Sequence, residues 1–249
     1  MKKIIIYMLF VVAGVTTMFG QETLQQANEA YAQEDYIKAI ELYEQTAREQ
    51  GVSSDLYYNL GNAYYKHNEF AKAILNYERA LLLNPGNEDA RFNLDMANMH
   101  IVDKIDPVGR FFLAVWIDSM RSFLSSNMWA VIGIVAFFLF LGGCYLYLFT
   151  RSVRLKKIGF FGGIVILLVA IMANWFAWGL SDKMERRSEA IVFAATVPAK
   201  SSPSESGTDL FVLHEGTKVV ILDKVSDWYE VKISDGNRGW LPSSSIEII

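Results

Sequence analysis

The sequence contains few of the residues from which most catalytic and metal sites are built. Among its 249 residues it has one cysteine and three histidines. Cys144 has no second cysteine with which to form an intrachain disulfide, and the three histidines, His67, His100 and His214, do not have the spacing of a metal-ligand motif. A phosphate-binding glycine loop and a serine, histidine and acid arrangement are also missing. We therefore predict that the protein is not an enzyme, with no catalytic residue, metal or cofactor.

Acidic residues are missing from the middle of the chain. Between Ser119 and Ser181 there is no Asp or Glu, and this stretch contains two apolar runs of about 20 residues, long enough to cross a bilayer as helices. Four basic residues separate the runs, and basic loops favour the cytoplasmic side. The pattern predicts transmembrane helices at 127–150 and 158–180, joined by a cytoplasmic basic loop at 151–157. Because the spans contain no charged residue, they anchor the protein and form no ion path.

The first 20 residues have the pattern of a secretory signal, since two lysines precede an apolar run. Two outcomes stay open. The segment is cleaved after Gly20, or it is retained as an anchor, because Met18 and Phe19 make a poor cleavage site. Either outcome exports the following residues, and the hairpin then returns the chain to the same side. Residues 21–106 and 181–249 are therefore predicted to face one compartment outside the cytoplasm.

Residues 21–106 contain a 34-residue period. A shift of 34 aligns Asn28 with Asn62, Tyr31 with Tyr65, Tyr36 with Phe70, Ala39 with Ala73 and Tyr43 with Tyr77. A period of this length is typical of helix-turn-helix repeats. The small side chains of Gly61 and Ala73 allow the two helices of a repeat to approach closely, and Pro85 ends the second helix. A further helix near 87–99 is predicted to cap the stack.

The better copy, 54–87, resembles the tetratricopeptide repeat at every main position, with Tyr57, Leu60, Gly61, Tyr64, Ala73, Tyr77, Ala80 and Pro85. The resemblance implies an all-α solenoid whose first helices line a concave groove. The positions that correspond to that groove are Asn28, Tyr31, Asp55, Tyr58, Asn62, Tyr65, Lys66, Phe92 and Met96. We expect an aromatic-walled peptide groove with amide donors, or repeats that serve only as a spacer or oligomer contact. Some relatives bind a terminal carboxylate through Lys and Arg, but Leu24, Asp89 and Asn93 occupy those places here.

Residues 107–126 are predicted to form an amphipathic helix at the membrane surface. One stripe of this helix is apolar and comprises Phe112, Val115, Trp116, Met120 and Phe123. The alternative is a core helix packed against the repeats. Tryptophans near the ends of the spans fit an aromatic belt on the outer face, and these are Trp129, Trp175 and Trp178.

Residues 181–249 are rich in short β patterns. Strands are expected near 189–193, 210–213, 218–224, 228–233 and 239–241, with a loop at 197–208. Asp235-Gly236 is a strong hairpin signal, and five short strands suggest a small closed barrel. The run from Asp209 to Ile249 resembles a bacterial SH3 (SH3b) domain. That resemblance makes Phe211, Trp228 and Trp240 candidate contacts for cell-wall peptides or short protein segments. Alternatively, the three aromatics only pack the barrel.

The complete order of modules resembles BatE-type proteins of the Bacteroides aerotolerance (Bat) group. The predicted fold is multidomain: an all-α repeat solenoid, a two-helix transmembrane hairpin and a small all-β SH3-like barrel. The resemblance implies a bacterial inner-membrane scaffold with both terminal domains in the periplasm. The bilayer and periplasmic segments of other membrane proteins, von Willebrand A domain proteins among them, are its expected partners. Acidic residues outnumber basic ones in both flanks, which argues against nucleic acid.

Two other functions stay open. The protein could be a wall-targeting subunit that directs a separate peptidoglycan hydrolase through its SH3b domain, with peptidoglycan peptides as ligands. It could also be a sensor that signals through the basic loop, although a loop of that length cannot form a cytoplasmic domain.

Overall fold

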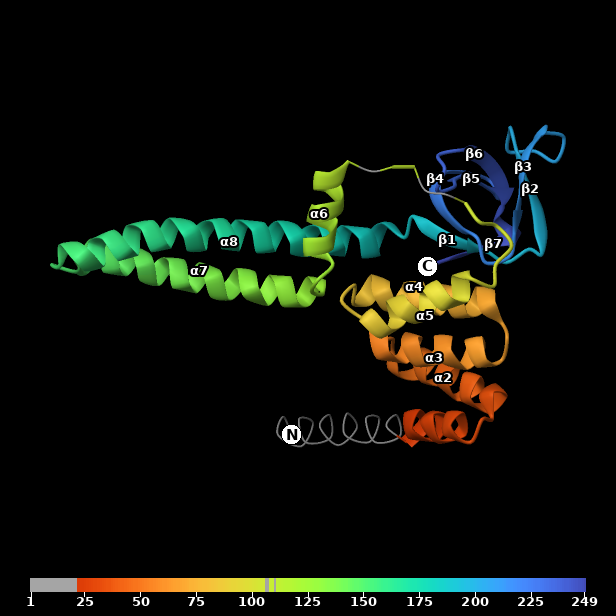
Figure 1. Ribbon diagram of the computed structural model, residues 1–249, viewed down its shortest axis with the longest axis horizontal. Helices are drawn as coiled ribbons and strands as arrows, with labels where there is room; N and C mark the ends of the chain where they lie inside the picture. The colour runs from red at the N-terminus through yellow and green to blue at the C-terminus, as the bar shows by residue number, and fades with distance from the viewer. Residues whose placement is uncertain (1–21, 106–107, 110) are drawn as a thin grey trace, which may run out of the picture. The chain divides into compact units, whose positions relative to one another are not determined.

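A computed structural model describes residues 22–105, 108–109 and 111–249. The predicted signal segment, 1–20, lies outside the described residues. The chain divides into two compact units (Figure 1). The first contains the repeat helices, the segment that follows them and the carboxy-terminal sheet. The second contains the three helices of the middle of the chain.

The first unit begins with paired antiparallel helices, as the repeat pattern predicts. They are a helix at 22–32, α2 (Tyr36–Gln50), α3 (Ser54–Lys66), α4 (Phe70–Leu83) and α5 (Glu88–Asn98). Asp35, Ser53 and Asn87 cap α2, α3 and α5 by accepting a hydrogen bond from a backbone N–H of the first turn. These residue types are preferred at helix starts because they satisfy a donor that has no partner within the helix.

The 34-residue period reappears in the geometry of the first unit. The Tyr43 hydroxyl donates to Asn28 Oδ1 over 2.7 Å, and 34 residues later Tyr77 donates to Asn62 Oδ1 over 2.8 Å. A Cβ atom added to Gly61 would lie 2.7 Å from two ring atoms of Tyr77. The expected close approach of the two helices at Gly61 is therefore confirmed, because a larger residue has no space there.

The carboxy-terminal residues form one antiparallel sheet of seven strands with the order β3-β2-β6-β5-β4-β1-β7. Its strands are β1 (Glu189–Val192), β2 (Thr196–Lys200), β3 (Asp209–His214), β4 (Lys218–Val225), β5 (Trp228–Lys232), β6 (Arg238–Pro242) and β7 (Ile246–Ile248), with the short helix η1 (Ser243–Ser245) before β7. Buried side chains from β1 to β6 form one apolar core. The sheet therefore curls around a single core, as a small SH3-like fold requires.

The expected loop at 197–208 is wrong in its first part, because residues 196–200 form β2. Pro198 hid this strand from the sequence pattern, since proline has no N–H to donate to a neighbouring strand. In the structure Pro198 is opposite Val212 of β3. On its other side β2 meets β6 only at the pair Lys200–Trp240, so the missing N–H leaves no gap in the pairing there. Together with β7, this strand raises the sheet from the five expected strands to seven.

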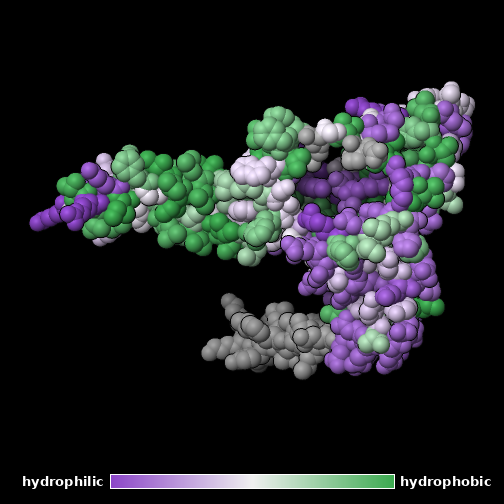
Figure 2. All heavy atoms as spheres, in the orientation of Figure 1, coloured by the Kyte–Doolittle hydropathy of each residue, from purple (hydrophilic) through white to green (hydrophobic). Residues whose placement is uncertain are grey.

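The second unit contains α6 (Phe112–Arg121), α7 (Ser126–Phe149) and α8 (Val153–Arg186). Only residues 150–152 separate α7 from α8, so the basic connector is partly helical. Both helices are long and apolar enough to cross a membrane. Figure 2 shows an apolar surface along the hairpin and hydrophilic side chains at its tip. This distribution fits a membrane protein.

Small residues bring the two long helices together near that tip. A Cβ atom on Gly159 would lie 2.6 Å from the carbonyl oxygen of Gly143, and one on Gly143 would lie 3.4 Å from Cα of Gly163. The backbones are therefore in direct contact, as expected where small residues face each other in membrane helices. Gly142 and Gly162 have no atom within 4 Å of an added Cβ, so they take no part in this contact.

At the other end of the hairpin, α6 packs across α7 and α8. Its Ile117 and Met120 join an apolar cluster that contains Trp129 and Phe176. Trp129 is only 9% exposed, and its Nε1–H donates to the carbonyl of Arg121 over 3.0 Å. Trp129 therefore lies under α6, whereas its place in an aromatic belt stays a prediction. Trp175 and Trp178, on α8, are exposed.

The predicted apolar stripe of residues 107–126 does not face one side in the structure, and its last residue, Phe123, follows the end of α6. Met120 faces the hairpin, as described above. Phe112, Trp116 and Phe123 are 70%, 61% and 73% exposed, and Val115 is also exposed. Residue 107, the first of the predicted helix, lies outside the described residues. The exposed aromatics give the unit a further apolar surface next to the hairpin, which suits contact with lipid.

Candidate functional site

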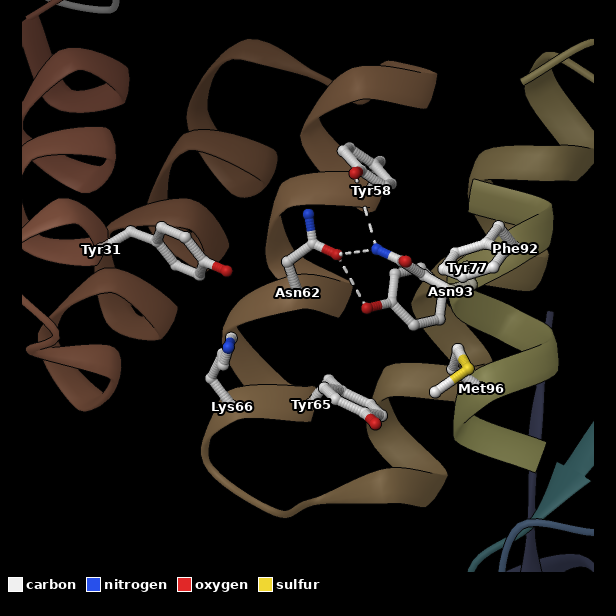
Figure 3. A pocket seen from close by; sticks show the side chains of 9 residues that line it. All are labelled: Tyr31, Tyr58, Asn62, Tyr65, Lys66, Tyr77, Phe92, Asn93 and Met96. Carbon is white, nitrogen blue, oxygen red and sulfur yellow. Dashed lines mark hydrogen bonds between the residues drawn. The ribbon is translucent and has the colours of Figure 1, made fainter. Parts of the chain in front are cut away.

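A pocket of about 320 Å³ opens on the face formed by the first helices of the repeats (Figure 3). Helix 22–32, α3, α4 and α5 supply its lining. The lining residues are Tyr31, Tyr58, Asn62, Tyr65, Lys66, Tyr77, Phe92, Asn93 and Met96. We call this surface the groove. The helices repeat every 34 residues and stack side by side, so residues distant in the sequence meet on one face.

The structure brings seven of the nine predicted groove residues together and leaves two outside. Asn28 accepts the hydrogen bond from Tyr43 instead of lining the pocket. Asp55 lies in the first turn of α3, where a negative charge suits the helix dipole. Two lining residues were not predicted, Tyr77 and Asn93. The sequence places Asn93 only where some relatives have a basic residue, and Tyr77 only among the positions of the repeat signature.

Hydrogen bonds fix the orientation of two side-chain amides in the groove. Asn62 Oδ1 accepts from the Tyr77 hydroxyl over 2.8 Å and from Asn93 Nδ2 over 2.7 Å. The same Asn93 nitrogen lies 3.5 Å from the Tyr58 hydroxyl. An amide oxygen has two lone pairs, and both are used here. The Nδ2 of Asn62 therefore points away from this network, between Tyr31 and Tyr58 (Figure 3).

Two of the tyrosine hydroxyls around these amides, those of Tyr77 and Tyr31, remain protonated. Burial raises the pKa of Tyr77, and nearby tyrosines raise it further. Burial is also the main cause that raises the pKa of Tyr31, and the neighbouring Tyr36 and Tyr58 raise it further. Because a protonated hydroxyl can donate, Tyr77 keeps its hydrogen bond to Asn62 over the whole physiological pH range. The polar part of the groove is therefore rich in O–H and N–H donors.

Aromatic and apolar side chains complete the groove. Tyr65 contacts Phe70 edge to face with ring centroids 5.5 Å apart, an arrangement repeated 34 residues earlier by Tyr31 and Tyr36. Phe92 is 65% exposed. Among the lining residues only Lys66 is charged. A donor-rich, aromatic-walled groove with one cation suits an extended peptide, whose carbonyl oxygens accept hydrogen bonds while its apolar side chains pack against the rings.

The predicted surface aromatics of the sheet occupy two different sides of it. Trp240 is opposite Glu230 and Lys200 on the neighbouring strands, and Trp228 and Trp240 are both partly exposed. Since Leu241 and Val231 alternate with these residues and are fully buried, the tryptophans lie on the outer face. Phe211 instead packs against the core, opposite buried Ala199. Phe211 is also partly exposed, so its role as a contact stays a prediction.

The comparisons with known families agree with this division of the chain. Residues 54–87 match the tetratricopeptide repeat, and residues 196–247 match the bacterial SH3 domain. The chain contains both modules. Both are interaction modules, and among the described residues no group of three or more His, Cys, Asp or Glu side chains could hold a metal ion. We refer to the carboxy-terminal sheet below as the SH3 domain.

Two solved structures of repeat domains are similar to the chain. The tetratricopeptide repeat domain of Arabidopsis OM64 has 13% identity and a TM-score of 0.33, covering 67% of this chain and 98% of its own. The corresponding Sgt2 domain from Aspergillus fumigatus has 14% identity and a TM-score of 0.31, covering 67% of this chain and 82% of its own. Scores this low carry no argument about function. No curated protein sequence matches the chain.

Proposed function

We propose that the protein is a non-enzymatic scaffold of the bacterial inner membrane whose groove binds an extended segment of a partner protein. The observation that carries this proposal is the fixed amide of Asn62. Two hydrogen bonds to its oxygen direct its nitrogen into the groove, between Tyr31 and Tyr58 (Figure 3). A peptide carbonyl can accept from this nitrogen without any rearrangement of the site, and such preorganisation favours binding.

Both modules face the periplasm in this proposal. The four basic residues of 151–157 would remain in the cytoplasm, and the hairpin would hold its two flanks on the opposite side. A topology reporter fused at Arg154 tests the orientation. Cytoplasmic activity of the reporter is expected, whereas periplasmic activity would reverse the placement of both modules.

The groove itself is tested by co-purification of the full chain in detergent. The informative variant combines Lys66→Ala with Phe92→Ala, because both side chains are exposed and their loss leaves the helix core intact. Asn62→Ala is less informative, because it would leave the Tyr77 hydroxyl and the Asn93 amide without their acceptor. We expect recovery of the partner to fall by roughly tenfold, as for the loss of interface hot spots.

The matched control combines Lys38→Ala with Met99→Ala, which removes one exposed lysine and one exposed apolar side chain outside the groove. Recovery should stay at the level of the unmodified chain. Equal recovery with the groove variant and the control would contradict peptide binding by the groove and would favour a spacer role for the repeats.

The identity of the recovered protein decides between two scaffolds. In the first, the protein belongs to a Bat-type aerotolerance or envelope-stress complex, and von Willebrand A domain proteins co-purify with it. In the second, it directs a peptidoglycan hydrolase to the wall through the SH3 domain, a function favoured by the outward-facing Trp228 and Trp240. For the second, Trp240→Ala in the full chain should reduce binding to purified peptidoglycan, and Trp175→Ala, on α8, is the matched control.

A further inference from the structure

Residues 101–105 follow α5 in the chain and contact the SH3 domain through alternate residues. Ile101 lies against Gly216 of the β3–β4 turn, and Ile105 packs against the core of the sheet. Val102, between them, is 68% exposed, and Lys104 donates to the carbonyl oxygens of Asn98 and Met99. Residues 101, 103 and 105 are partly buried whereas 102 and 104 are exposed, so the three alternate residues face the SH3 domain.

Asp103 is the central contact of this segment. Its Oδ2 accepts from the His214 backbone N–H over 2.8 Å and from the Thr217 hydroxyl over 2.6 Å, and its Oδ1 lies 2.7 Å from His214 Nδ1. The Asp103 side chain is only 12% exposed. Burial favours the neutral acid, but the hydrogen bonds from Thr217 and His214 outweigh it and lower the pKa of Asp103. The β3–β4 turn thus forms a fitted site for one carboxylate.

Ion pairs between α4 and the SH3 domain accompany the contact of Asp103. Lys218 Nζ lies 2.7 Å from a carboxylate oxygen of Glu78 on α4 and 2.9 Å from one of Glu189 on β1. Arg79, the next residue of α4, donates to Glu247 over 3.0 Å and to the carbonyl of Ile248 over 2.9 Å. Desolvation lowers the pKa of Lys218, but the two carboxylates outweigh it and raise the pKa. Charges on α4 therefore meet charges of opposite sign on the SH3 domain at two points.

We propose that residues 101–105 are an internal ligand of the SH3 domain, and that this ligand and the two ion-pair contacts hold the repeats and the SH3 domain as one rigid body. The segment begins three residues after α5 ends, and such a short tether gives it a high effective concentration at the turn. The groove and the Trp228–Trp240 face then keep one orientation, and the carboxylate site of the turn is closed to other proteins.

The distance between the two modules tests the proposal directly. The full chain in detergent, with Cys144→Ser, receives spin labels at Glu41→Cys on α2 and Asp223→Cys on β4, two exposed positions. Double electron–electron resonance should give one narrow distance distribution. A broad distribution in this parent chain would overturn the rigid body.

The release variant combines Asp103→Ala with Lys218→Ala, and it should broaden the distribution. Its matched control, Asp95→Ala with Lys38→Ala, removes the same two charge types from exposed positions and should keep the distribution narrow. A narrow distribution in the release variant would overturn the proposal.

Hydrogen exchange supplies a second readout, for the case in which the release variant alters the fold of the SH3 domain. In the single variant Asp103→Ala, the His214 amide loses its acceptor and should exchange at least about tenfold faster. The amide of Val231, a core residue, reports whether the domain remains folded. An unchanged His214 amide, or equal acceleration of both amides, would show that residue 103 is not a specific ligand of the turn.

Discussion

Substitution of Gly61 by alanine should destabilise the second repeat, although alanine is the better helix former. Gly61 lies in α3, and a Cβ at this position would lie 2.7 Å from Cδ1 and Cε1 of Tyr77 and 3.2 Å from its Cζ. The Tyr77 ring has little freedom to move, because its side chain is 1% exposed and its hydroxyl is bonded to Asn62.

Two opposing effects determine the magnitude. Alanine is favoured over glycine inside a helix by about 1 kcal/mol. Adding a methyl group to a filled core costs about 1–3 kcal/mol. Because the Tyr77 ring is held at its backbone and at its hydroxyl, we place the overpacking cost of Gly61→Ala at the upper end. The free energy of local unfolding of α3 and α4 should therefore fall by about 2 kcal/mol.

Hydrogen exchange of the full chain measures this free energy, because amides of a locally opened segment exchange in proportion to its open population. A loss of about 2 kcal/mol corresponds to exchange that is roughly 30-fold faster in α3 and α4. Gly142→Ala is the matched control, since no atom lies within 4 Å of its added Cβ, and it should leave these amides unchanged. Unchanged or slower exchange in Gly61→Ala would refute the close contact of α3 with Tyr77.

Three further predictions concern other contacts. Gly159→Leu should lower the thermal stability of the hairpin in detergent, because its Cβ meets the backbone of α7, whereas Gly162→Leu should not. Trp129→Phe removes the hydrogen bond to the Arg121 carbonyl and should accelerate exchange in α6, at a cost of about 1 kcal/mol. The pKa of Asp103 is lowered on folding, so its contribution to stability is present above the ordinary carboxyl pKa of about 4 and disappears as the pH falls further. The urea concentration that unfolds the first unit should therefore fall less between neutral and acidic pH in Asp103→Asn than in the unmodified chain.

The repeat helices and most of the groove could be predicted because the same local pattern occurs twice. Each repeat places its tyrosine and asparagine at equivalent points, so the pair Tyr43–Asn28 and the pair Tyr77–Asn62 have nearly equal geometry. Apolar periodicity and small residues were sufficient to align them. Asn93 was missed as a groove residue because its role depends on a contact with Asn62 in the preceding repeat, and no residue pattern within α5 indicates such a contact.

The hairpin could be predicted without any repeated pattern, because the length of each apolar run and its lack of charge are sufficient to indicate a membrane span. The runs did not predict which aromatic side chains would be covered by neighbouring helices. Trp129 and Trp175 lie near the same end of the hairpin, yet only Trp129 is buried. The difference arises from α6, which packs through Ile117 and Met120 beside Trp129. A position along the span gives the depth of a side chain, but its neighbours decide its exposure.

The contact of Asp103 with the SH3 domain had no signal in the sequence, and the reason is its separation from its partners. Asp103 and His214 are 111 positions apart, and neither belongs to a repeated pattern. Viewed alone, Asp103 is one charged residue of a short run between two predicted helices, and His214 precedes an ordinary turn. The sequence pattern placed a domain boundary next to this residue, where contacts between modules are expected to be few.

The structure instead places a buried carboxylate against three hydrogen-bond donors of the SH3 domain. If Asp103 left this position, the donors would lack an acceptor until water replaced the carboxylate. The two modules are therefore not independent. Residues 101–105 are therefore part of the folded core of the first unit, and a repeat fragment that ends before residue 101 and an SH3 fragment that begins at residue 188 would each lack these contacts.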